Sequence, residues 1–174
     1  MPWLLPSVES LGCMRLVPAT GLAESMSEIL FYHLTERPLE HVLPGLLEKC
    51  LERGWRVVVQ AGSRERIEAL DAHLWTWREE SFLPHGMLRD GTESRQPVWL
   101  TEEDDNPNQA NVRFMLDGVV PPDLGGYERG VYIFDGHDNE AVEAARARWK
   151  AEKSAGHDVT YWQQNARGGW EKKA

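Results

Sequence analysis

The stretch that decides the fold class of this chain is Arg56-Val57-Val58-Val59-Gln60-Ala61. A continuous β-branched run of this kind is typical of a strand that is buried on both faces. Between residues 39 and 51, apolar side chains recur every three or four positions, which predicts an amphipathic helix directly before this strand. Gly54 is placed to end that helix as a C-cap residue.

Strands and helices alternate along the rest of the chain. Apolar segments predict further strands at residues 28–34, 97–100, 112–116 and 130–134. Two more helices are expected, one from a Ser63 cap to about Leu74 and one over residues 139–155, capped by Asp138 or Asn139. This alternation predicts a single α/β domain of Rossmann-like topology, with a central, largely parallel sheet flanked by helices on both faces.

Such a sheet raises the question of nucleotide binding. The turns that follow the first two predicted strands, residues 35–39 and 60–66, carry neither a G-x-G-x-x-G fingerprint nor a G-x-x-x-x-G-K-[ST] phosphate loop. The six histidines show no zinc-ligand spacing, and no nucleophile motif is present. We therefore expect no metal, no cofactor and no intrinsic catalysis, and keep a small nucleotide-binding enzyme as the alternative function.

Composition bounds the partners. The chain has 174 residues, enough for one core, and its 19 basic against 28 acidic residues give a net charge of −9. This balance argues against direct, sequence-independent binding to nucleic acid. The two cysteines, Cys13 and Cys50, lie far apart, which suits a reducing cytoplasm. No apolar run approaches the roughly 18 residues of a membrane span.

The sequence divides into three parts. Residues 1–25 contain three prolines and no amphipathic period, so we expect a poorly ordered N-terminal extension, with an ordered arm as the alternative. Residues 26–165 are expected to form the folded domain. Residues 166–174 are expected to be a flexible C-terminal tail.

Large aromatic residues gather after the second predicted helix. If that helix ends near Leu74, then Trp75, Trp77 and Phe82 lie in a polar loop that continues into Leu83-Pro84. A loop has no amphipathic pattern that buries such side chains. They belong either to the core or to a docking surface for another protein, with Trp77 at its rim.

The last predicted helix carries an unusual stripe. Val142, Arg146, Trp149 and Lys153 follow one another at spacings of four, three and four residues, with Lys150 beside them. This stripe suits a groove wall for an acidic peptide with an apolar anchor, because arginine bonds carboxylates and tryptophan packs on aromatic side chains. The alternative is an ordinary solvated helix. A stripe of small residues is expected to lie against the sheet, namely Ala141, Ala144, Ala145, Arg148 and Ala151.

Several motifs resemble one known family. Asp71-x-x-Leu74-Trp75, followed by Glu80-Ser81-Phe82-Leu83-Pro84-His85, is similar to the chi subunit of bacterial DNA polymerase III holoenzyme, a clamp-loader accessory protein. The resemblance runs from about residue 26 to residue 162. It includes, in order, Phe31-Tyr32-His33-Leu34, Gly54-Trp55-Arg56-Val57, Ala145-Arg146-Ala147-Arg148-Trp149-Lys150 and Ala155-Gly156-His157.

The resemblance implies a non-catalytic adaptor that takes part in DNA replication in the cytoplasm and reaches DNA only through a partner. In the family the last helix binds the acidic C-terminal tail of single-stranded DNA-binding protein, and the matching positions are Arg146 and Trp149. Val142 replaces a lysine and Asp135 an apolar residue, which should weaken an acidic ligand. Compensating cations are expected among Lys150, Lys153 and Arg113.

The resemblance also implies a second partner. In the family, the region that corresponds to Trp75, Phe82 and Pro84 contacts the psi subunit, which links chi to the clamp loader. The partner of this chain is accordingly expected to be a psi-like protein, another clamp-loader subunit or a helicase.

Overall fold

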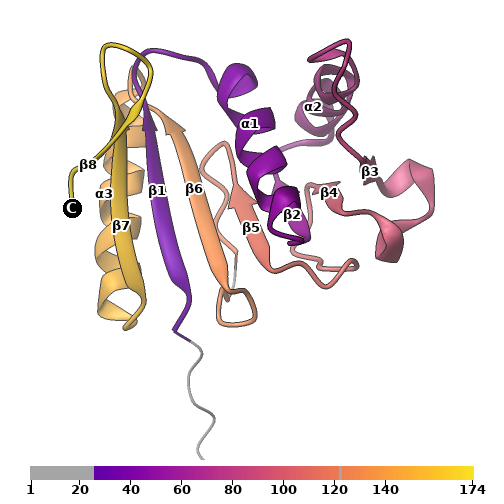
Figure 1. The fold of residues 1–174 in the computed structure, drawn as a ribbon. Helices are drawn as coiled ribbons and strands as arrows, with labels where there is room; N and C mark the ends of the chain where they lie inside the picture. Colours follow the sequence, from indigo (N-terminus) through magenta and orange to yellow (C-terminus); the bar gives the residue numbers. More distant parts are fainter. Residues whose placement is uncertain (1–25, 122) are drawn as a thin grey trace, which may run out of the picture.

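The computed structural model describes residues 26–121 and 123–174, so the extension predicted over residues 1–25 lies outside the described part. Within that part, eight strands form one sheet in the order β3-β4-β2-β5-β6-β1-β7-β8 (Figure 1). Their bounds are β1 Glu28–Leu34, β2 Val57–Gln60, β3 His85–Met87, β4 Val98–Thr101, β5 Val112–Met115, β6 Arg129–Asp135, β7 Asp158–Gln164 and β8 Trp170–Lys172. All neighbouring pairs are parallel except β7 and β8.

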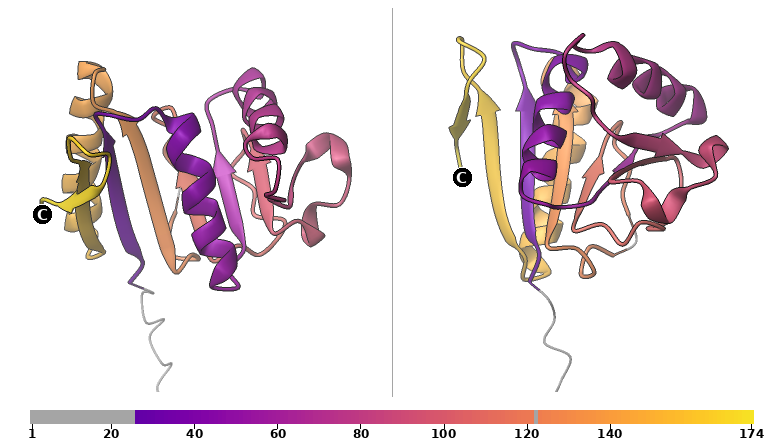
Figure 2. Two further views of the ribbon diagram at one scale, coloured as in Figure 1. Left: turned by 45° about the horizontal axis from the view of Figure 1, so that its top comes forward. Right: turned by 45° about the vertical axis from the view of Figure 1, so that its right-hand side comes forward.

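The helices cover both faces of the sheet. Helices α1, Leu39–Glu52, and α2, Arg64–Thr76, lie on one face, and α3, Asn139–Ser154, lies on the other (Figures 1 and 2). Two short 3₁₀ turns, Leu88–Asp90 and Glu93–Arg95, separate β3 from β4. This arrangement confirms the predicted α/β class with a central, mostly parallel sheet.

Each strand contributes to two apolar clusters because successive side chains point to opposite faces. Leu30 of β1 and Val57 of β2 belong to the cluster under α1 and α2, together with Leu43 and Leu70. The next residues along the same strands face α3 instead, in a second cluster that includes Phe31, Val58, Trp99, Tyr132 and Ala145. The β-branched run is therefore buried on both faces, as predicted.

A proline inside α1 ties this helix to α2. Pro44 has no backbone N–H, so the carbonyl of Glu40 lacks its usual partner four residues later. The ring Nε2 of His73 lies 2.6 Å from that carbonyl oxygen and donates to it when protonated at this nitrogen. The unpaired acceptor of one helix thus becomes the attachment point of its neighbour.

The second helix begins as predicted and ends later. The Ser63 hydroxyl accepts a hydrogen bond from the backbone N–H of Arg66 at 3.2 Å, which confirms the N-cap. The helix continues to Thr76, so the prediction that Trp75 lies in a loop is wrong. Trp75 is instead in the last helical turn, and Trp77 is the C-cap residue.

The end of the chain differs from the flexible tail predicted over residues 166–174. Trp170–Lys172 form β8, which pairs with β7, a strand that the sequence analysis did not predict. The turn between them is held by Asn165, whose side-chain oxygen accepts from the backbone N–H groups of Arg167 and Gly169 at 3.0 Å. Gly168 has a φ of +74° there, a conformation that favours glycine.

Buried Gln164 attaches β7 to the start of the first crossover. Its side-chain oxygen accepts hydrogen bonds from the backbone N–H groups of Thr35, Glu36 and Arg37, at 2.9, 2.9 and 3.0 Å. In the described ranges, no helix combines the length and the apolar character that crossing a membrane requires.

Candidate functional site

Helix α3 presents one edge to solvent beside β7. Asp138 caps the helix and accepts from the backbone N–H groups of Glu140 and Ala141 at 3.0 and 3.3 Å, as expected. Ala145 and Glu152 are buried against the sheet, and Trp149 is half-buried against the second apolar cluster. The inner face therefore runs along the line of Ala145, Trp149 and Glu152.

The stripe of small residues expected to face the sheet is only partly correct. Ala145 is buried and Arg148 half-buried, but Ala144 and Ala151 are exposed. The reason is that Arg148 and Glu152 form an ion pair at 2.5 Å on this side of the helix. The Tyr132 hydroxyl donates a hydrogen bond to Glu152 and accepts one from Arg148, each at 2.9 Å. This network replaces small side chains along part of the inner face.

Arg146, Lys150 and Lys153 are exposed on α3, and Val142 is half-buried beside them. The Lys153 ammonium lies 4.6 Å from the centroid of the Trp149 ring. Among the described residues, Arg146 forms no ion pair, in contrast to Arg148. An unpaired guanidinium next to a half-buried indole has the chemistry of a carboxylate and aromatic-anchor site.

The wall opposite this edge comes from β7. Val159 and Tyr161 are half-buried and pack against the same cluster as Trp149. The hydroxyl of Tyr161 lies 2.9 Å from Nδ1 of His33 in β1. Burial raises the pKa of Tyr161, whereas the positive charge of Arg146 acts to lower it. Sequence reasoning missed His33 and Tyr161, because 128 positions separate the two.

Two residues expected to modulate this site have different roles. Arg113, expected as a compensating cation, is 1% exposed in β5 and unavailable to a surface ligand. Its guanidinium donates to the side-chain oxygen of Gln60, to the Tyr127 hydroxyl and to two backbone carbonyls. Asp135 is exposed at the end of β6, and hydrogen bonds from His137, led by that of its backbone N–H, lower the pKa of its carboxyl. The acidic group stays charged near the site.

The second candidate surface is aromatic and lies where α2 ends. Trp75 is 57% and Phe82 74% exposed, and their ring centroids are 6.1 Å apart. Pro84 and Trp77 are half-buried, and the guanidinium of Arg78 lies 4.2 Å from the Trp77 ring. We call Trp75, Trp77, Phe82 and Pro84 the aromatic surface.

Leu83, predicted to belong to this surface, does not. It is 3% exposed and packs in the cluster under α1 and α2. Its backbone carbonyl accepts a hydrogen bond from Nδ1 of His85 at 2.7 Å. Leu83 lies two residues before β3, which begins at His85 and pairs with β4, so its side chain packs in the core beside this strand.

A buried polar group supports the aromatic surface from below. One carboxylate oxygen of Asp71 accepts a hydrogen bond from the exposed Arg89 at 2.6 Å. Its other oxygen lies 3.2 Å from Nε2 of His85, which is within ion-pair distance, although the two atoms do not form a hydrogen bond. The His85 ring in turn lies 4.9 Å from the ring of Trp75. Asp71 and His85, which the motif resemblance includes, thus fix the loop against the last turn of α2.

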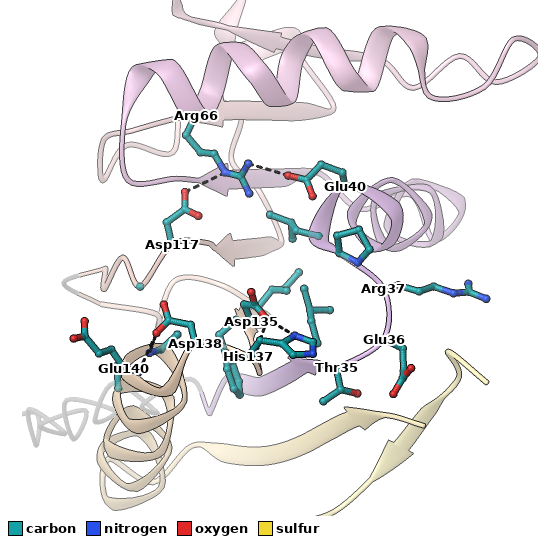
Figure 3. A pocket seen from close by; sticks show the side chains of 18 residues that line it. Thr35, Glu36, Arg37, Glu40, Arg66, Asp117, Asp135, His137, Asp138 and Glu140 are labelled. Atoms are coloured by element: carbon teal, nitrogen blue, oxygen red, sulfur yellow. Dashed lines mark hydrogen bonds and ion pairs between the residues drawn. The ribbon is translucent and has the colours of Figure 1, made fainter. Parts of the chain in front are cut away.

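A cavity of about 750 Å³ lies at the carboxyl ends of β1 and β6 (Figure 3). The chain continues from β1 into α1 on one face of the sheet and from β6 into α3 on the other face. Open α/β sheets commonly bind ligands at such a point, beyond the carboxyl ends of the two strands. Six carboxylates line this cavity against two arginines and one histidine: Glu36, Glu40, Asp117, Asp135, Asp138, Glu140, Arg37, Arg66 and His137.

The negative charges that line this cavity disfavour the binding of a nucleotide, whose phosphates are also negative. Asp138 already accepts the N–H groups at the start of α3, where a phosphate would otherwise bind. Arg66 is occupied by Glu40 at 2.9 Å and Asp117 at 3.4 Å, as Figure 3 shows. Across residues 26–121 and 123–174, no three His, Cys, Asp or Glu side chains are grouped to hold a metal ion.

Comparisons with known proteins agree with the motifs. Residues 26–160 match the family model described as DNA polymerase III chi subunit, HolC. The chain is 31% identical over 91 residues to a probable DNA polymerase III subunit chi of Rickettsia prowazekii, which covers 52% of this chain and 55% of the relative. It is 28% identical over 78 residues to the DNA polymerase III subunit chi of Pseudomonas aeruginosa, covering 44% of this chain and 55% of that protein.

The chain spans about half the length of these curated relatives in the matched regions. The family model, in contrast, covers nearly all of the domain from the residues before β1 into β7. The resemblance inferred from the aromatic motif is therefore confirmed, and the chain belongs to the DNA polymerase III chi subunit family.

Proposed function

We propose that this protein is a non-catalytic adaptor of the replicase, which binds the acidic C-terminal tail of single-stranded DNA-binding protein and links it to the clamp loader. The observation that carries the proposal is the edge of α3, where Arg146 has no ion-pair partner among the described residues and borders half-buried Trp149. The protein acts during replication in the cytoplasm, and it contacts DNA only through its partner.

The tail binds between α3 and β7 in this proposal. Arg146 bonds a tail carboxylate, while Trp149 and the half-buried side chains of β7 receive the apolar end. Lys150 and Lys153 add positive charge along the same edge. Val142 supplies no charge and Asp135 supplies a negative one, so these two residues limit the affinity.

The second partner docks on the aromatic surface. Exposed aromatic residues are costly in water and dominate interface energetics, which favours a protein partner there. The partner is a psi-like protein or another clamp-loader subunit, with a helicase as a further candidate. The exposed pair of Trp75 and Phe82 supplies the anchor.

The two surfaces are far enough apart to be used together. Helix α3 packs on β6 and β7, whereas α2 packs on β3 and β4, near the other end of the sheet and on its other face (Figure 1). One partner therefore leaves the surface of the other free, as an adaptor requires.

A titration of the full chain with an acidic peptide ending in Pro-Phe tests the tail site. Arg146→Ala should weaken binding by about 1.5–3 kcal/mol, the range for hydrogen bonds to charged groups. Binding should also weaken with added salt, because exposed charges are screened within about 10 Å at 0.1 M. The matched control is Arg95→Ala, which removes an exposed arginine from the 3₁₀ turn before β4. Equal affinities for both variants, with intact circular dichroism, would refute the assignment.

The alternative, a small nucleotide-binding enzyme, is disfavoured by the carboxylates around the cavity at β1 and β6. A saturating ligand at about 100 times its dissociation constant adds about 2.7 kcal/mol of stability. A clear rise of the melting temperature with ATP or GTP would therefore support the enzyme in place of the adaptor.

A further inference from the structure

His33 occupies an unusual position beneath the tail site. Its ring stacks on Phe134 of β6, with centroids 5.0 Å apart, and meets Tyr161 of β7 edge-on at 5.9 Å. Gly136 allows this placement, because a Cβ there would lie 2.1 Å from the ring Nε2. That nitrogen is buried and has no hydrogen-bond partner among the described residues.

Because Nε2 is buried without a partner among the described residues, Nδ1 is the ring nitrogen that contacts a neighbouring polar group. Nδ1 lies 2.9 Å from the hydroxyl oxygen of Tyr161. When Nδ1 carries a proton it donates to that oxygen, and the phenolic O–H is then free to donate outward. Tyr161 is half-buried and packs against the same apolar cluster as Trp149 of α3, which puts this donor on the side of β7 that borders the tail site.

The charges around this pair favour an anion. The titratable and charged groups that act on His33 are Arg146 of α3, Tyr161 of β7, and Asp135 and His137 at the end of β6. Burial lowers the pKa of His33, and Arg146 acts in the same direction, more strongly than Asp135 opposes it. An anion bound at Arg146 would offset the positive charge of that guanidinium and would therefore raise the pKa of His33.

We propose that His33 and Tyr161 form a hydrogen-bonded relay beside Arg146 that recognises the terminal carboxylate of a bound acidic peptide. Arg146 supplies the charge, Tyr161 donates the hydrogen bond, and His33 is a positioning residue that orients the Tyr161 hydroxyl.

This inference rests on the proposed tail binding, and a mutant cycle separates the two. The probes are an acidic peptide ending in Pro-Phe with a free carboxylate and the same peptide with an amidated C-terminus. Tyr161→Phe and His33→Phe should each lower the affinity for the free-carboxylate peptide about tenfold, the scale of one hydrogen bond to a charged group. The affinity for the amidated peptide should fall less than about twofold. The double variant should lose no more than either single variant.

Tyr32→Phe is the matched control, since Tyr32 lies in β1 on the opposite face and packs on Trp170. Equal weakening of both peptides, or none, would overturn the relay while leaving tail binding intact. If the unmodified protein binds neither peptide, the proposed function itself fails, and the relay with it.

A measurement on the unmodified protein avoids any folding defect of the variants. Side-chain nitrogen NMR should show the pKa of His33 rising when the free-carboxylate peptide is added, and staying constant with the amidated one. A His33 titration that both peptides leave in place contradicts the relay.

Discussion

Replacing Phe82 with alanine separates a docking role from a core role, because the two predict opposite losses. Phe82 is 74% exposed, so the side chain buries about a quarter of its surface. Full burial of a phenylalanine is worth about 1.5–3 kcal/mol, and a quarter of that is about 0.4–0.8 kcal/mol. The unfolding free energy of Phe82→Ala should fall by less than about 1 kcal/mol, compared with about 3–5 kcal/mol for a core phenylalanine.

Clamp-loader binding should respond far more strongly. An exposed aromatic anchor that becomes buried in an interface contributes about 2 kcal/mol or more, which is about thirtyfold in affinity. The assay combines urea denaturation with two binding measurements, one for the clamp-loader assembly and one for the acidic tail peptide. Phe82→Ala should lose only the first.

The neighbouring residue provides the matched control. Leu83 is 3% exposed, so Leu83→Ala should cost about 2–5 kcal/mol of stability through the cavity it leaves. Phe82 does not act as a docking residue if Phe82→Ala destabilises the fold as much as Leu83→Ala, or if clamp-loader binding survives the loss of the Phe82 ring.

Three further predictions concern the fold. Ser63→Ala should lower the unfolding free energy by about 1 kcal/mol in urea denaturation, through loss of the bond to Arg66, whereas Ser63→Asp should restore it. Burial lowers the pKa of His33 in the folded protein, so the unfolded chain binds a proton at this histidine more tightly. The stability that is present above about pH 6.5 should therefore be lost as the pH falls below that value, and His33→Phe should flatten this part of the curve of unfolding free energy against pH. Deleting residues 1–25 should change the melting temperature by no more than a few degrees, because the sequence of this segment has three prolines and no amphipathic period.

The central part of the fold was predictable because its signals are local. The valine run of β2, the amphipathic period of α1 and the Ser63 cap each follow from neighbouring residues. The strand β7 was not predicted, since its sequence DVTYWQQ is half-exposed and partly polar. Its strand state depends on pairing with β1, which lies far away in sequence.

The candidate site shows the same division. The α3 residues share one helix, so spacing alone brought Arg146 and Trp149 together. His33 and Tyr161 reach the site only because β1 and β7 are neighbours in the sheet, and Leu83 is buried only because β3 joins the sheet beside β4. No periodicity within a segment carries that information.

A bridging experiment tests whether one chain joins the two proposed partners at the same time. Acidic tail peptide is immobilised, the protein is bound to it, and the clamp-loader assembly is then added. The clamp loader should be retained only when the protein is present, and Arg146→Ala and Phe82→Ala should each abolish retention. Displacement of the protein from the peptide by the clamp loader would show a single shared surface and contradict the bridging role.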